Sequence, residues 1–169
     1  MSQKFKSVPV EADALYICTM PLLAGSFHWS FLHVDPTGAC TRHHWAAVTL
    51  DVRGREAYVE QALPNGLSSA PTAQILGCFK IADLAPPEIG DFRAACRAIF
   101  TKSFPTADEN RKHAITCRTW MMKIVATLLS PERAEQIEKD VIARSRAFEG
   151  DYLSAFMAGR RYECVVQDV

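Results

Sequence analysis

Two segments of this 169-residue chain carry residue types that could do chemistry. His28 and Trp29 adjoin in an early segment rich in aromatic residues, and Cys117, Arg118 and Trp120 stand close together in a later one. An imidazole can act as a general base. A cysteine attacks a carbonyl carbon once its thiolate is stabilised by an imidazolium, a cation or a helix N-terminus. These residue types indicate thiol chemistry, provided that folding brings the two segments together.

The histidine segment is expected to form a β-hairpin over residues 26–52. Its centre, Asp35-Pro-Thr-Gly38, has proline at the second turn position and glycine at the fourth, as a type I turn prefers. A turn centred between the proline and the threonine predicts that His28 lies nearly opposite Trp45. The hairpin would therefore bring these two side chains together.

The register of the hairpin decides which side chains share a face. Because side chains alternate along a strand, the predicted pairing places His28 on one face with His43 and Trp45. The opposite face is the more continuously apolar, so we expect both histidines to turn towards a polar side. A register that differs by one residue would exchange His43 for His44. The alternative to a catalytic role is that His28 is a hydrogen-bonded structural histidine or an exposed one.

The cysteine segment is expected to lie within a helix that runs from Thr106 to Leu129. His113 precedes Cys117 by about one turn and Arg118 follows it, so both are local candidates to stabilise a thiolate. Cys117 also heads an apolar stripe with Trp120, which is typical of a core position. Well inside a helix the thiol gains little from the helix dipole, whereas a helix start nearer to the cysteine would help.

The order of a His-Trp strand, a second polar residue on the next strand and a later cysteine helix resembles the circularly permuted papain-like thiol enzymes. Among these enzymes, the chain is compared with the lecithin:retinol acyltransferase and NlpC-type group. The chain also resembles a group of small, uncharacterised fungal proteins with a His-Trp strand and a Cys-Arg-aromatic-Trp type of helix. The likeness spans roughly residues 14–129 and rests on short motifs.

The resemblance implies that His28 is the base, that His43 (or His44) orients it, and that Cys117 is the nucleophile of a hydrolase or acyltransferase. Water or an amine would then resolve the acyl-enzyme. The substrate-binding residues that we expect are Trp29, Trp45, Arg118 and Trp120. The acyltransferases usually carry Asn-Cys-Glu-His-Phe where this chain has Thr-Cys-Arg-Thr-Trp, and they have a terminal membrane anchor that we do not find. A soluble small molecule or a peptide amide or ester is therefore the expected substrate.

Two other functions fit the same residues. A small biosynthetic enzyme, such as a cyclase or an isomerase, could use His28 as a base without a covalent step. A non-catalytic domain could line an apolar pocket with Trp29, Trp45 and Trp120. Retention of turnover in Cys117→Ser but not in His28→Ala would indicate the first of these two.

Composition excludes several other classes. Basic and acidic residues balance at 19 each, which disfavours nucleic acid and anionic membrane as partners. The six cysteines form no Cys-x-x-Cys pair, so neither a disulfide framework nor a zinc site is expected. Cys40 with His43 and His44 would be a weak metal site, because neighbouring strand residues point to opposite faces. We expect a cytoplasmic protein without a cofactor or metal; self-association is possible.

The elements that must position these residues form an α+β domain. Strands are expected at residues 14–20, 26–34, 42–52, 57–63 and 74–84, and helices at 87–102, 106–129 and 130–150. Ser130-Pro131 is typical of a helix start, Gly150 of a helix end, and alternation after residue 161 of a final edge strand. We therefore predict a single domain, residues 1–169, with an antiparallel sheet from the N-terminal half packed against about three helices from the C-terminal half.

Overall fold

The computed structural model describes residues 9–22, 25–48, 54–64, 66–68 and 74–169. Their fold is α+β, as predicted, with a six-stranded sheet in the order β4-β3-β2-β1-β5-β6. All neighbouring strands are antiparallel except β5 and β6, which are parallel. The strands are β1 (Ala14–Pro21), β2 (Phe27–Val34), β3 (Cys40–Ala47), β4 (Glu56–Leu63), β5 (Gly77–Lys80) and β6 (Val165–Asp168), and a short 3-10 turn spans Gly66–Ser68. The predicted third strand also included residues 49–52, which lie outside the described residues.

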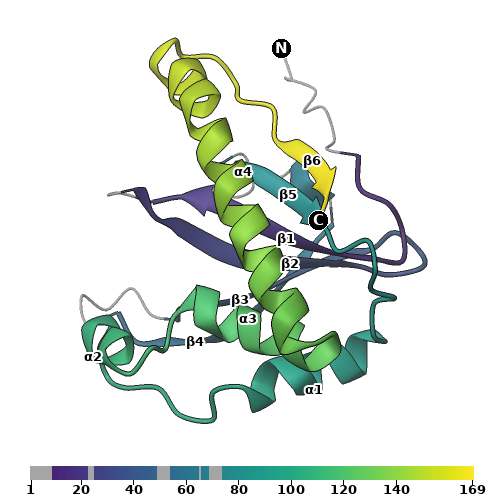
Figure 1. Cartoon of the computed structure of the whole chain (residues 1–169), viewed down its shortest axis with the longest axis vertical. Coiled ribbons are helices and arrows are strands. Elements are labelled where there is room, and N and C mark those ends of the chain that lie inside the picture. Colours follow the sequence, from purple (N-terminus) through teal and green to yellow (C-terminus); the bar gives the residue numbers. More distant parts are fainter. Residues whose placement is uncertain (1–8, 23–24, 49–53, 65, 69–73) are drawn as a thin grey trace.

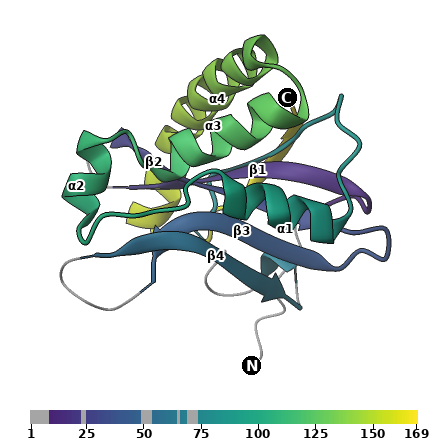
Figure 2. The same ribbon diagram turned by 90° about the horizontal axis from the view of Figure 1, so that it is seen from below.

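The described helices lie on one face of the sheet, which we call the helix-covered face (Figure 2). They are α1 (Ile89–Ala98), α2 (Ala107–Lys112), α3 (Cys117–Leu128) and α4 (Pro131–Met157). The long α4 runs diagonally across the sheet in Figure 1. The main core lies between these layers, where Phe31, Phe92 and Trp120 are buried. A second buried cluster, which includes Tyr16 and Leu32, lies on the opposite face. None of the described helices is long and apolar enough to cross a membrane.

The predicted register of the β2–β3 hairpin is wrong by one residue. Gly38 has a φ of +85°, and Val34 pairs with Cys40 rather than with Ala39. A left-handed residue after a type I turn adds one residue to the loop, as in the three-residue hairpin loops that end in a glycine bulge. The oxygen Oδ1 of Asp35 accepts bonds from the backbone N–H groups of residues 37 and 39, which holds this turn.

The shifted register separates the two predicted histidines. Phe31 pairs with His43, so His43 shares the helix-covered face with Trp29 and Phe31. His28 lies on the opposite face, where its ring contacts His44. The prediction that His28, His43 and Trp45 share a face is therefore wrong, and the alternative register, in which His44 takes the place of His43 beside His28, is the one observed.

The predicted helix from Thr106 to Leu129 is two helices. The chain turns sharply at Ala114, whose φ is +56°, and the carbonyl of Asn110 accepts the N–H of Ile115. Asn110 is fully buried, and its side-chain oxygen accepts the N–H of Phe104 while its amide donates to Glu56 of β4. These bonds fix the end of α2.

The helix α3 restarts at Thr116, which caps it. The Thr116 hydroxyl accepts the N–H of Thr119, and the Thr119 hydroxyl accepts the N–H of Thr116. This reciprocal arrangement satisfies two N–H groups that the first turn leaves without helical partners. Cys117 is therefore the first residue of α3 rather than a residue deep within a helix.

The last helix begins as predicted and ends later than predicted. Ser130 caps α4 with Pro131 in its first position, but the helix passes through Gly150 and continues to Met157. Gly159, with a φ of +62°, follows its end instead. Tyr152 and Ala155 pack beyond Gly150, so tertiary contacts carry the helix past the glycine. The predicted edge strand is present as β6.

Candidate functional site

A pocket of about 410 Å³ opens at the N-terminus of α3. Residues at the beginning of β2 form one side, and α4 contributes Ile142 and Arg146 on the other. Phe27 and Trp29 are its large buried apolar residues, and Cys117 is half-buried beside them. The described residues that line it are Leu22, Gly25, Ser26, Phe27, Trp29, Arg111, Thr116, Cys117, Arg118, Ile142 and Arg146.

The Cys117 thiol is held in its neutral form. Burial raises its pKa above the ordinary value, and this outweighs hydrogen bonds from the backbone N–H groups of Trp29 and Arg118, which lower it. The nearby charges have opposite effects, since Glu56 raises the pKa and Arg111 lowers it. Because a thiol needs its thiolate form to attack, Cys117 lacks the activation that a nucleophile requires.

Three arginines, Arg111, Arg118 and Arg146, line the same pocket as this thiol, and all are exposed. Arg118 forms an ion pair with Glu138 at 3.2 Å, and Arg111 lies 3.6 Å from Glu56. Arg146 forms no ion pair within the part of the chain that the structure describes. The lining of this pocket therefore combines cationic and apolar side chains.

His28 does not reach this pocket, because it lies on the opposite face of the sheet. Its Nε2 is 2.9 Å from Nδ1 of His44. Burial and then the charge of Arg42 lower the pKa of His28 to about 4 and that of His44 to about 3. Both rings are neutral at pH 7. The side chain that β2 presents towards Cys117 is that of Trp29.

His43 is a core residue. It is fully buried, its Nδ1 lies 2.7 Å from the Tyr58 hydroxyl, and its ring packs edge-on against Phe92. The Tyr58 hydroxyl donates to Glu60, which Arg93 holds from α1. Burial lowers the pKa of His43 to about 4, although the Glu60 charge opposes this change. His43 thus orients neither His28 nor Cys117.

The remaining predicted tryptophans are also core residues. Trp45 packs edge-on against Phe100, with ring centres 5.2 Å apart. Trp120 stacks on Tyr58 and donates its indole N–H to the carbonyl of Cys96. Of the predicted site residues, the structure therefore brings together Trp29, Cys117 and Arg118 and leaves the other four elsewhere.

Sequence reasoning missed two arginines of this pocket. Arg111 precedes Cys117 by six residues, a spacing that suggests no contact until the chain breaks at Ala114. Arg146 comes from α4, and nothing local in the sequence links it to Cys117. Only the packing of α4 against α3 places it there.

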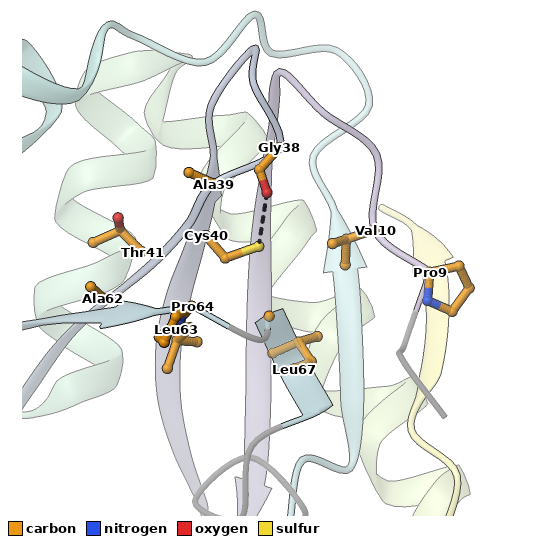
Figure 3. Close-up of a pocket in the computed structure, with 11 residues that line it drawn as sticks. Pro9, Val10, Gly38, Ala39, Cys40, Thr41, Ala62, Leu63, Pro64 and Leu67 are labelled. Carbon is orange, nitrogen blue, oxygen red and sulfur yellow. Dashed lines mark hydrogen bonds between the residues drawn. The ribbon is translucent and has the colours of Figure 1, made fainter. Parts of the chain in front are cut away.

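A second hollow, of about 430 Å³, lies at the hairpin end of the sheet (Figure 3). Cys40 points into it and bonds the carbonyl of Gly38 at 3.7 Å. Burial raises the pKa of this thiol as well. The described lining residues are Pro9, Val10, Gly38, Ala39, Cys40, Thr41, Ala62, Leu63, Pro64, Gly66 and Leu67, none of which is charged. This hollow offers apolar contact without a group that could do acid-base chemistry.

The described residues contain no cluster of three or more histidine, cysteine or acidic side chains that could hold a metal ion. Cys40 and His44 lie on one face of β3 and His43 on the other, so these three cannot bind one metal together. Searches for similar proteins give no further assignment: no family model, no curated protein and no solved structure matches this chain.

Proposed function

We propose that this chain binds a small organic anion, without covalent chemistry, in the pocket at the N-terminus of α3. The observation that carries the proposal is that Arg111, Arg118 and Arg146 line one pocket of about 410 Å³ together with Phe27 and Trp29. Ligand pockets commonly combine an apolar lining with a few polar groups that fix orientation. An aromatic or aliphatic body on Phe27 and Trp29, with a carboxylate towards the arginines, fits this pattern.

Charge supports the orientation of such a ligand. Arg118 and Arg111 each have an acidic partner, whereas Arg146 has none among the described residues, so the wall keeps a net positive charge. The N-terminus of α3 adds the positive end of a 12-residue helix dipole on the same side. A negatively charged group would therefore be favoured here over a neutral group of the same shape.

The thiol hydrolase or acyltransferase expected from the sequence is the second candidate. What favours it is the place of Cys117, in the first position of α3 and within a pocket. It requires a base other than His28, and no histidine lines the pocket among the described residues. The binding function needs no such base, which is why we place it first.

Benzoate and benzamide test the proposal, because they share a shape and differ in charge. Calorimetry should give a dissociation constant on the order of 1 mM for benzoate and weaker binding for benzamide. In NMR spectra, benzoate should shift the amide signals of Thr116, Cys117 and Arg118. Arg146→Met should weaken benzoate binding about tenfold, while Cys117→Ser should leave it unchanged.

Arg97→Met is the matched control, since Arg97 is an exposed arginine on α1 that lies outside the pocket lining. Equal binding of benzoate and benzamide would contradict the anion site. An equal loss in Arg97→Met and Arg146→Met would show only a general effect of charge. Loss of benzoate binding in Cys117→Ser would show that the Cys117 thiol itself contacts the ligand and would contradict a site built on the arginines.

A further inference from the structure

Arg42 is a buried cation without an anionic partner in the described part of the chain. It lies on β3, on the face opposite the helices, and only 7% of its surface is exposed. Its Nη2 contacts the sulfur of Met20 at 3.1 Å, and its buried Nε has no hydrogen-bond partner. Among the described residues no carboxylate forms an ion pair with it.

This environment leaves the guanidinium group poorly compensated. A buried charge loses its hydration and normally recovers that loss through an ion pair and hydrogen bonds. A thioether is only a weak acceptor. The Nε and Nη2 atoms lie along one edge of the guanidinium plane, the edge that binds the two oxygens of a carboxylate in parallel. Arg42 thus has the two N–H groups that bind a carboxylate in parallel, but no carboxylate to accept them among the described residues.

Met20, His28 and His44 are neighbours of Arg42 on this face of the sheet. Met20 pairs with His28 across β1 and β2, and His28 bonds His44, which lies two residues beyond Arg42 on β3. The charge of Arg42 lowers the pKa of both histidines, so it acts on both rings. Both histidines are half-buried and so are more exposed than Arg42.

The neutral histidine pair can donate to an anion whichever tautomer it adopts. If Nε2 of His28 donates to Nδ1 of His44, the second proton of the pair lies on Nε2 of His44. If His44 donates instead, that proton lies on Nδ1 of His28. In either case one ring N–H of the pair is left over for an acceptor outside it.

We propose that Arg42, together with the His28–His44 pair, binds the carboxylate of a small acid on the face opposite the Cys117 pocket. The carboxylate enters by displacing the half-buried histidine rings beside Arg42, because Nε is fully buried. One oxygen then accepts the N–H of Nε, the other replaces the Met20 sulfur at Nη2, and the remaining imidazole N–H gives a further bond. This site is independent of the pocket at α3, from which the sheet separates it. A planar carboxylate fits the guanidinium edge better than a spherical anion does.

Sodium acetate is a suitable probe because it is small enough to enter beside half-buried rings. In NMR titrations at pH 7, acetate should shift the Nε signal of Arg42 and the ring signals of both histidines in a saturable manner, whereas chloride should not. Arg42→Lys keeps the charge but loses the planar edge, so acetate affinity should fall at least tenfold. Arg97→Met, at an exposed arginine of α1 outside both sites, should leave it unchanged.

Proton uptake gives a second measurement. A bound carboxylate should raise the pKa of the His28–His44 pair, against the effects of Arg42 and His43 on β3. Cys18 of β1 also faces Arg42. Acetate binding should therefore tighten as the pH falls from 7 to 5.5. The wild-type titrations suffice if Arg42→Lys does not fold. Equal shifts with chloride, an unchanged Arg42 signal, or affinity retained in folded Arg42→Lys would overturn the proposal.

Discussion

At the scale of single residues, Cys117 is subject to two opposing influences. The first position of a helix favours a thiolate, and the N–H groups of Trp29 and Arg118 point to its sulfur. Burial beside Trp29 opposes ionisation more strongly, so the pKa of the thiol is raised. Position in a helix alone therefore does not make a cysteine reactive when its surroundings exclude water.

Alkylation by iodoacetamide measures this balance. The rate at Cys117 at pH 7.5 should be at least tenfold below that of free cysteine, and it should keep rising up to and beyond pH 9, because a raised pKa lowers the thiolate fraction at neutral pH. Peptide mass spectrometry, with Cys117→Ser as the control, assigns the site. A rate that already reaches a plateau below pH 7 would indicate a thiolate and favour the thiol enzyme.

At the scale of elements, two short backbone features decide what α3 and the hairpin present. The left-handed Gly38 sets the register that places His43 on the helix-covered face and His44 beside His28, and the left-handed Ala114 ends α2 so that α3 can begin at Cys117. Each feature involves a single residue, yet each changes the surroundings of a whole face or helix. Because side chains alternate between the two faces of a strand, a shift of one residue changes the face of all of them. Because a helix begins at its cap, the position of the cap decides which residues form its first turn.

A pair of glycine substitutions tests the backbone argument. Gly38→Ala places a side chain at a φ of +85° with no atom within 4 Å, so the cost is backbone strain of about 1 kcal/mol in the free energy of unfolding. Gly150→Ala, in the interior of α4 with equally open surroundings, should instead stabilise the protein by about 1 kcal/mol. Urea denaturation measures both. Equal effects of the two substitutions would contradict the assigned conformations.

At the scale of the whole molecule, the sheet separates two sets of polar groups. Cys117 and its arginines lie with the helices, and Arg42 with His28 and His44 lies on the opposite face. Each set includes a cation without an acidic partner among the described residues. A molecule with a formal net charge of zero can therefore present two separate positive sites.

Buried neutral histidines make the stability of the whole fold depend on pH. The pKa values of His28 and His43 are lowered to about 4 and that of His44 to about 3, against 6.5 for a free imidazole. Between pH 6.5 and about 4 the unfolded chain binds more protons than the folded one, so the free energy of unfolding falls as the pH falls. Above pH 7 these groups contribute no pH dependence.

Between pH 7 and pH 5 the expected loss is about 2 kcal/mol for each of these histidines. Urea denaturation in carboxylate-free buffers measures it. A His28→Gln, His44→Gln double variant retains one histidine of the three and should lose about one third as much over the same range. A wild-type free energy of unfolding that stays constant from pH 7 to pH 5 would show that these rings are not held neutral.

Local patterns in the sequence were sufficient for much of the fold. Aromatic and β-branched runs predicted β1 and β2, Ser130-Pro131 predicted the start of α4, and the order of elements predicted an α+β fold. Each of these features depends on residues that are close together in the chain, so local conformational preferences are sufficient to predict it. The same reasoning drew attention to Trp29, Cys117 and Arg118, which do meet in one pocket.

Only the tertiary structure decided which groups meet the thiol and the base. The sequence shows His28 and Cys117. The extra residue at Gly38, however, shifts β3 by one position against β2, so each β3 side chain lies on the opposite face from the one that the predicted pairing gives it. His28 therefore meets His44 and Arg42, and Cys117 meets Trp29 and Arg146 of a distant helix. Register and helix packing depend on contacts between residues far apart in the chain. For this reason the sequence by itself determined most of the strands and helices, whereas the tertiary structure decided which side chains meet.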